Sequence, residues 1–154
     1  MSVMTTVSRR SRPPQLGAPV APAAVTLLEQ ARRGLQEAAA LPAAPDRYAA
    51  AHLAALRASA AVLAARAQAA DPRGRRRRPT SAWVLLTAVA PELGEWAAFF
   101  AAGAGKRAAA EAGVQHAVSG READDLVRDV QTFLALVETT LGLLPGPRLA
   151  ALAG

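Results

Sequence analysis

The most constraining feature of this sequence is an uninterrupted run of 25 residues, Asp46–Ala70, which contains neither proline nor glycine. Apolar residues recur within it at steps of three and four, namely Leu53, Leu56, Ala60, Leu63 and Ala67. This spacing is typical of one face of an amphipathic α-helix. We therefore expect a single long helix with this face turned to the core and Asp46 as its N-cap. The other elements are expected to pack on it.

The residue composition favours helices over strands throughout the chain. Of the 154 residues, 41 are Ala, and only 4% are aromatic. Ala has the highest helix propensity, because it loses no side-chain entropy on entering a helix. No run of alternating β-branched residues is bounded by turn signals. The sequence predicts an all-α fold, a single up-and-down bundle of about four to five helices.

Proline and polar residues mark the ends of this predicted domain. Residues 1–21 are polar, contain Arg and are interrupted by Pro, so we expect a disordered tail. The helical bundle is expected over residues 22–144. Pro145 and Pro147 should end the last helix, leaving 145–154 as a frayed tail.

Two predicted helices flank the long run. The first begins near Pro22, ends before Pro42 and has an apolar face formed by Ala24, Leu28, Ala31, Leu35 and Ala38. The last is opened by Ser119 and Glu122, which have the spacing of a capping box. Its predicted buried face consists of Ala123, Leu126, Val127, Val130, Phe133, Leu134, Val137 and Leu141.

Between them lies a helical stretch that is interrupted by Pro91. Thr80 or Ser81 should cap a helix containing Trp83, Leu86 and Ala90. Because Pro91 has no N–H to donate, we expect a kink or a restart there. An inward stripe should follow, formed by Leu93, Trp96, Phe100 and Gly103.

The formal charge of +6 is concentrated in two short segments. Arg9, Arg10 and Arg12 contribute +3, the segment 71–78 contributes five Arg less one Asp, or +4, and the remainder carries −1. The Arg-rich loop at 71–79 is either a solubilising, solvated loop or a contact site for nucleic-acid phosphates or an acidic partner. The candidate binding residues are Arg73, Arg75, Arg76, Arg77 and Arg78.

Several other classes of function are disfavoured. The chain has no Cys and two His, so we expect no metal site and no cofactor, and the lack of Cys agrees with a cytoplasmic protein. Glu92 and Glu95 make a membrane span costly in the otherwise apolar stretch around them. Gly103-Ala104-Gly105-Lys106 does not fit a phosphate-binding loop, and its small residues favour close helix packing.

Two groups of polar residues invite a chemical interpretation. Glu122, Asp125 and Asp129 share one side of the last helix, which favours a solvated acidic face over a metal site or a catalytic carboxylate pair. On the long helix, His52 falls on the same side as Tyr48 and Leu56. It is therefore either a packed core histidine or part of a functional pair with Arg47, whose side chain should diverge from it by about 140°.

The pair Arg47-x4-His52, which opens a long helix in an all-helical domain, resembles the HEPN superfamily. The wider sequence is similar to a small actinobacterial HEPN-like family over roughly residues 22–143. The residues that carry this similarity are RYAAAHLAALRASAAVLAAR, the Arg-rich loop and SAWVLLTAVAPELGEWAAFFAAGAGKRAAAEAG. The resemblance implies a helical bundle that could form a homodimer. Many HEPN proteins are ribonucleases, so it also makes Arg47 and His52 candidate catalytic residues.

These observations lead to two functional hypotheses. The first is a non-catalytic interaction module that binds a protein or a nucleic acid, with RNA or DNA contacted through the Arg-rich loop. The alternative is a metal-independent endoribonuclease. In that case His52 would act as general acid or base and Arg47 would stabilise the charged phosphorane.

Overall fold

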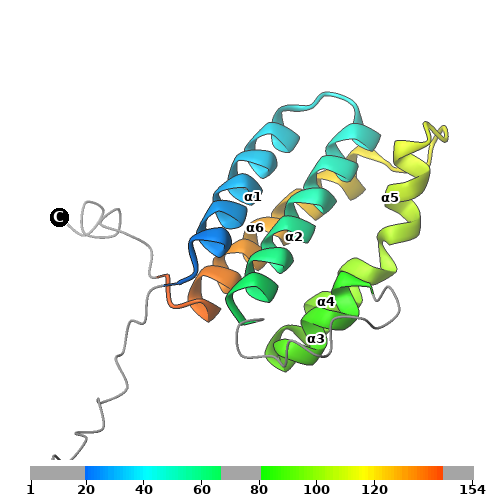
Figure 1. Cartoon of the computed structure of the whole chain (residues 1–154). Helices are drawn as coiled ribbons and strands as arrows, with labels where there is room; N and C mark the ends of the chain where they lie inside the picture. The colour runs from blue at the N-terminus through cyan, green and yellow to red at the C-terminus, as the bar shows by residue number, and fades with distance from the viewer. Residues whose placement is uncertain (1–19, 67–80, 144–154) are drawn as a thin grey trace, which may run out of the picture.

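The computed structural model describes residues 20–66 and 81–143, and within these ranges the chain contains helices and no strand (Figure 1). Its elements are α1 (Pro22–Ala40), α2 (Ala44–Arg66), α3 (Ala82–Val89), the 3-10 helix η3 (Pro91–Leu93), α4 (Gly94–Ala102), α5 (Ala104–Glu111) and α6 (Gly120–Thr140). The all-α prediction is confirmed. The predicted Arg-rich loop, the continuation of the second helix to Ala70, most of the N-terminal tail and residues 145–154 lie outside the described residues.

The helices alternate in direction around α2 (Figure 1). Helix α1 packs antiparallel along α2, the segment from α3 to α5 leads the chain back, and α6 returns beside α1 and α2. Helix α2 contacts α1, α3, α5 and α6 and is therefore the central helix of the bundle. This arrangement agrees with the organising role predicted for it.

Helices α1 and α6 bury the faces that their sequence patterns predict. The buried residues of α1 are Ala24, Leu28, Ala31, Leu35 and Ala38. Those of α6 are Ala123, Leu126, Val127, Val130, Phe133, Leu134 and Val137, and Leu141 is partly buried. Each helix has the core on one side and solvent on the other, so its apolar stripe identifies the inward face.

The predicted buried face of α2 is wrong. Leu53 is 37% exposed, and Leu56 and Leu63 are only partly buried. The buried positions are Tyr48, Ala51, His52, Ala54, Ala55, Ala58, Ser59, Ala61 and Val62. Because α2 has neighbours on several sides, small side chains lie at the close contacts and the larger Leu residues lie at the margins.

The start of α2 also differs from the prediction. The helix begins at Ala44, and the backbone N–H of Arg47 donates to the carbonyl of Ala43 at 3.0 Å. Asp46 is therefore not the N-cap but a residue of the first turn, where its charge still favours the positive end of the helix. Pro45 permits this earlier start, since proline is tolerated in the first helical turn.

The stretch between α2 and α6 follows its sequence signals. Ser81 caps α3 by accepting a hydrogen bond from the Trp83 N–H, and Pro91 opens η3, as the predicted restart requires. Gly103 separates α4 from α5; a Cβ there would lie 2.8 Å from the Tyr48 hydroxyl. The close approach of α2 at this junction therefore favours glycine, because a methyl group would have to displace the end of the Tyr48 side chain.

Aromatic rings form the centre of the core on this side. Phe100 stacks on Trp83 with ring centroids 5.1 Å apart and lies 4.9 Å from Phe133. Both phenylalanines are fully buried. The α3–α4 segment is thus fixed against α6 by its aromatic side chains, which bury much apolar area.

By length and composition alone, α2 is apolar enough to cross a membrane, with a mean hydropathy of 1.3 over its best window. Half of that window, 50%, is buried inside the bundle. A central core helix passes the same test, so this property is weak support for a membrane span.

Candidate functional site

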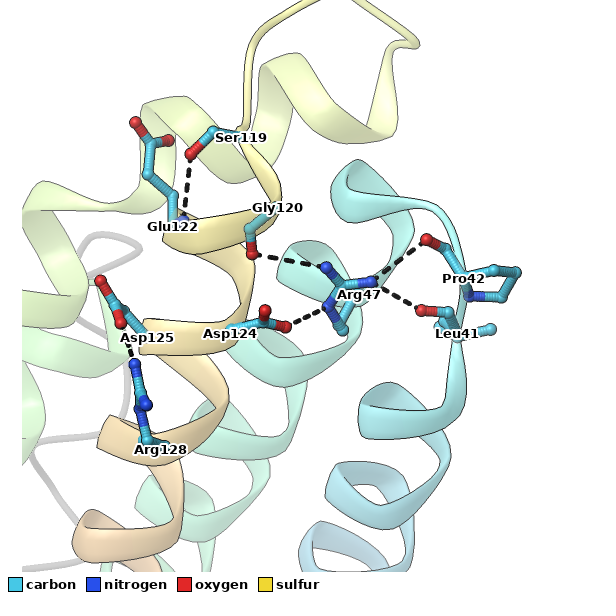
Figure 2. A network of polar contacts seen from close by, with 9 residues as sticks. All are labelled: Leu41, Pro42, Arg47, Ser119, Gly120, Glu122, Asp124, Asp125 and Arg128. Atoms are coloured by element: carbon cyan, nitrogen blue, oxygen red, sulfur yellow. Dashed lines mark hydrogen bonds and ion pairs between the residues drawn. The ribbon is translucent and has the colours of Figure 1, made fainter.

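Arg47 connects three segments of the bundle at the start of α2 (Figure 2). Its Nη1 donates to the carbonyl oxygens of Leu41 at 2.8 Å and Pro42 at 3.2 Å, and its Nη2 donates to that of Gly120 at 3.4 Å. Leu41 is the C-cap of α1, where backbone carbonyls lack helical partners. Arg47 thus satisfies carbonyls at the end of α1 and at the beginning of α6.

The same guanidinium has one acidic partner. Asp124 of α6 places its Oδ1 2.9 Å from Arg47 Nε, as an ion pair without the alignment of a good hydrogen bond. The Arg47 side chain is 13% exposed and that of Asp124 is 63% exposed. The buried Nε of Arg47 thus faces Asp124, whereas its bonds to the Pro42 and Gly120 carbonyls are exposed and its bond to Leu41 is partly buried.

His52 lies within the aromatic core. Its residue exposure is 1%, and its Nε2 lies 2.9 Å from the carbonyl oxygen of Phe100. The ring contacts Trp83 and Phe100 edge to face, with centroid distances of 5.7 and 6.0 Å. His52 therefore joins α2 to α4 through the hydrogen bond and the aromatic contact to Phe100, and to α3 through the aromatic contact with Trp83.

The partner of Nε2 determines which ring nitrogen carries the proton. A carbonyl oxygen only accepts, so Nε2 is the protonated nitrogen and Nδ1 is an acceptor. Nδ1 is buried and has no hydrogen-bond partner among the described residues. Burial lowers the pKa of His52 below its ordinary value, and the bond to Phe100 opposes this only in part. The neutral imidazole is thus favoured.

Arg47 and His52 have separate sets of partners. Arg47 turns toward the α1–α2 turn and the start of α6, whereas His52 turns toward Phe100 at the opposite side of α2. The divergence expected from the helical wheel is observed. Within residues 20–66 and 81–143 no hydrogen bond or ion pair joins the two side chains, and each is bonded mainly to backbone carbonyls.

A second polar group lies beside them and was not anticipated. Lys106 of α5 forms an ion pair with Glu122 of α6 at 2.9 Å. Tyr48 is close enough that Lys106 and Glu122 both affect its hydroxyl, whose pKa is raised chiefly by burial. Ser119 caps α6 as predicted by accepting from the Glu122 N–H, but the Glu122 carboxylate is held by Lys106.

The acidic residues of α6 have different environments. Glu122 pairs with Lys106, Asp125 pairs with Arg128 (Figure 2), and Asp129 is half-buried with a pKa raised by burial and by Asp125. Over the described part of the chain, no group of three or more potential metal ligands comes together. The other candidate binding residues, Arg73, Arg75, Arg76, Arg77 and Arg78, lie outside the described residues.

The all-helical bundle around α2 is the class of fold expected of a small HEPN-like domain. A family model described as HEPN-like matches residues 38–138, more than half of the chain, and the chain belongs to this HEPN-like family. The match extends from the end of α1 to the end region of α6. Comparisons with curated proteins and with solved structures gave no match.

Proposed function

We propose that this protein is a non-catalytic HEPN-like interaction module that binds a protein or a nucleic-acid partner. The observation that carries the proposal is the state of His52, which is 1% exposed and bonded to the Phe100 carbonyl. A general acid or base must reach the proton that it transfers, at a heavy-atom distance of about 2.6–3.2 Å or through one water. A ribose hydroxyl has no such access to a histidine enclosed by Trp83 and Phe100.

The environment of Arg47 supports the same conclusion. Stabilisation of a phosphorane requires guanidinium donors that are directed at the substrate. In this bundle Nη1 and Nη2 donate to the Leu41, Pro42 and Gly120 carbonyls, and Nε faces Asp124. Protein oxygens thus face four of the five guanidinium N–H groups, which leaves one Nη2 N–H and no free pair of donors for bidentate binding of a phosphate.

The rival function is a metal-independent endoribonuclease that uses Arg47 and His52. To separate the two, chelator-treated protein is incubated with a mixed single-stranded RNA, alongside His52→Leu and Arg47→Met. Arg128→Met serves as a matched control, because Arg128 is an exposed arginine that loses the same charge. The proposal predicts no cleavage by any of the four proteins.

The contrary result is also specific. Cleavage by the wild type and by Arg128→Met that disappears in both His52→Leu and Arg47→Met, with helical circular dichroism retained, would establish the ribonuclease. Cleavage that all four proteins share equally would indicate a contaminant, because it would not depend on the candidate pair. Only cleavage that depends on both His52 and Arg47 would imply that the aromatic core opens to admit RNA.

Nucleic-acid binding is tested separately from cleavage. Replacing Arg75, Arg76, Arg77 and Arg78 with Gly and Ser removes four positive charges from the Arg-rich segment. If this segment contacts phosphates, affinity for RNA or DNA falls in the variant and the dependence of affinity on salt becomes shallower. If the wild type and the variant had equal affinities for RNA and DNA that did not depend on salt, the partner of the module would be a protein.

A further inference from the structure

The surface between α4 and α6 carries a pocket that has no part in the Arg47 and His52 contacts. Its volume is about 330 Å³, and it is lined by Glu95, Trp96, Phe99 and Asp129. Trp96 and Phe99 lie edge to face at 6.2 Å, and Phe99 remains 46% exposed. The partly buried Trp96 and the exposed Phe99 therefore form an aromatic wall that is open to solvent.

Core packing holds the aromatic wall of this pocket in place. Trp96 stacks on Phe100 with centroids 6.0 Å apart and packs on Phe133 at 5.7 Å. Both of these phenylalanines are fully buried. The Trp96 ring is therefore a preorganised surface that need not be ordered when a ligand binds.

The charge of the pocket is negative. Glu95 and Asp129 form no ion pair with any residue of the described ranges, whereas the neighbouring Asp125 pairs with Arg128. Asp129 is half-buried, and burial together with the charge of Asp125 raises its pKa, so its carboxylate gains from a positive partner. Ring faces and carboxylates both attract cations, and no basic side chain lines this pocket.

We propose that this pocket receives a basic side chain, Arg or Lys, of a protein partner, with the cation held between the Glu95 and Asp129 carboxylates and against the Trp96 and Phe99 rings. This inference rests on the proposed function, since it supplies the partner chemistry for the interaction module. A guanidinium suits the pocket well, because it can stack on an aromatic ring while donating to a carboxylate.

The chain has two tryptophans, which provides a direct measurement. In a Trp83→Phe background Trp96 is the sole tryptophan, and its fluorescence reports on the pocket. The probes are a capped glycine peptide with a central arginine, the same peptide with neutral citrulline, and free spermidine. The arginine peptide is expected to change the signal saturably, whereas the citrulline peptide should not.

Substitutions then locate the site. Asp129→Asn and Glu95→Gln should each weaken binding of the arginine peptide several-fold, and Phe99→Leu should do so while keeping an apolar side chain. Asp125→Asn is the matched control: it removes the same charge one turn away on α6 but does not line the pocket. It should change the affinity by less than about twofold, because Asp125 is already paired with Arg128 and its side chain is 49% exposed, so that solvent screens its charge.

Three outcomes would overturn the inference. Equal binding of arginine and citrulline peptides would exclude recognition of charge. Equal weakening by Asp125→Asn and Asp129→Asn would show diffuse electrostatic attraction instead of a site. Tighter binding of spermidine than of the arginine peptide would make a free polyamine the ligand. None of these results alters the RNA cleavage measurement, so failure of this site is distinguishable from failure of the proposed function.

Discussion

Replacing Arg47 with Met tests whether this residue is a structural connection between α1, α2 and α6. Met preserves much of the apolar stem and removes the guanidinium. The lost interactions are three donations to carbonyls, at 2.8, 3.2 and 3.4 Å, and the ion pair with Asp124. We expect the free energy of unfolding to fall by about 2–4 kcal/mol.

The magnitude follows from the geometry. A hydrogen bond that involves a charged group contributes about 1.5–3 kcal/mol, and only the bond to Leu41 has a short distance. The bonds to Pro42 and Gly120 are longer and add less. The ion pair contributes at most about 1 kcal/mol, because Asp124 is 63% exposed and screened by solvent. Since the contacts share one guanidinium, their contributions are not additive.

Urea unfolding, followed by far-ultraviolet circular dichroism, measures the change in the free energy of unfolding. Asp124→Asn and the Arg47→Met/Asp124→Asn double variant complete a double-mutant cycle. We expect Asp124→Asn to cost less than about 1 kcal/mol and the coupling energy to be equally small. The free energy of unfolding of Arg47→Lys should fall between those of the wild type and Arg47→Met, since a compact ammonium cannot span the Leu41 and Gly120 carbonyls as the planar guanidinium does. The carbonyl bonds would not be the main contribution if Arg47→Met left the free energy of unfolding unchanged. The same conclusion would follow if the coupling energy with Asp124 equalled the whole loss caused by Arg47→Met.

Three further predictions concern the core. Burial lowers the pKa of His52 from its ordinary 6.5, so the unfolded chain binds a proton more readily than the folded chain. The stability contributed by neutral His52 is therefore complete above about pH 6.5 and is lost as the pH falls toward the lowered pKa of the folded state. Urea unfolding at several pH values should show this dependence, and His52→Leu should reduce it. Gly103→Ala should cost about 1–2 kcal/mol, because the added Cβ would meet the Tyr48 hydroxyl at 2.8 Å, and Tyr48→Phe should relieve most of this loss in thermal unfolding. Phe133→Ala should cost about 3–5 kcal/mol and Leu56→Ala less than about 2, since Phe133 is fully buried and Leu56 only partly; equal costs in urea unfolding would contradict this.

The sequence predicted the helices at the edge of the bundle better than the helix at its centre. For α1 and α6 one apolar stripe faces the core, so periodicity alone identified the buried residues. Helix α2 has neighbours on several sides, and its buried set is mostly alanine. Alanine occurs in α2 at buried and partly buried positions alike, so the more hydrophobic Leu residues dominated the pattern and indicated the wrong face.

Local signals gave the breaks and caps, while distant partners remained hidden. Ser81, Pro91 and Ser119 act on atoms within a few residues, and the structure confirms all three. Besides the nearby Leu41 and Pro42, Arg47 bonds to Gly120, which is 73 residues away, and His52 bonds to Phe100, which is 48 residues away. No spacing rule reaches across such separations, because they depend on how whole helices dock. The candidate pair could be named from sequence, but its surroundings could not.

The small residues of α2 also explain why its polar side chains are engaged within the bundle. Alanine lets neighbouring helices approach closely, so a polar side chain on α2 finds a backbone carbonyl of another segment within hydrogen-bond distance. Arg47 finds Gly120 and His52 finds Phe100. A central helix of this kind holds the bundle together, and it leaves few of its own polar atoms for a ligand. Exposed aromatic and acidic side chains instead occur on α4 and α6, which each have a side free of the core. Partner recognition is therefore expected at the periphery of the bundle, although the candidate pair Arg47 and His52 lies on its central helix.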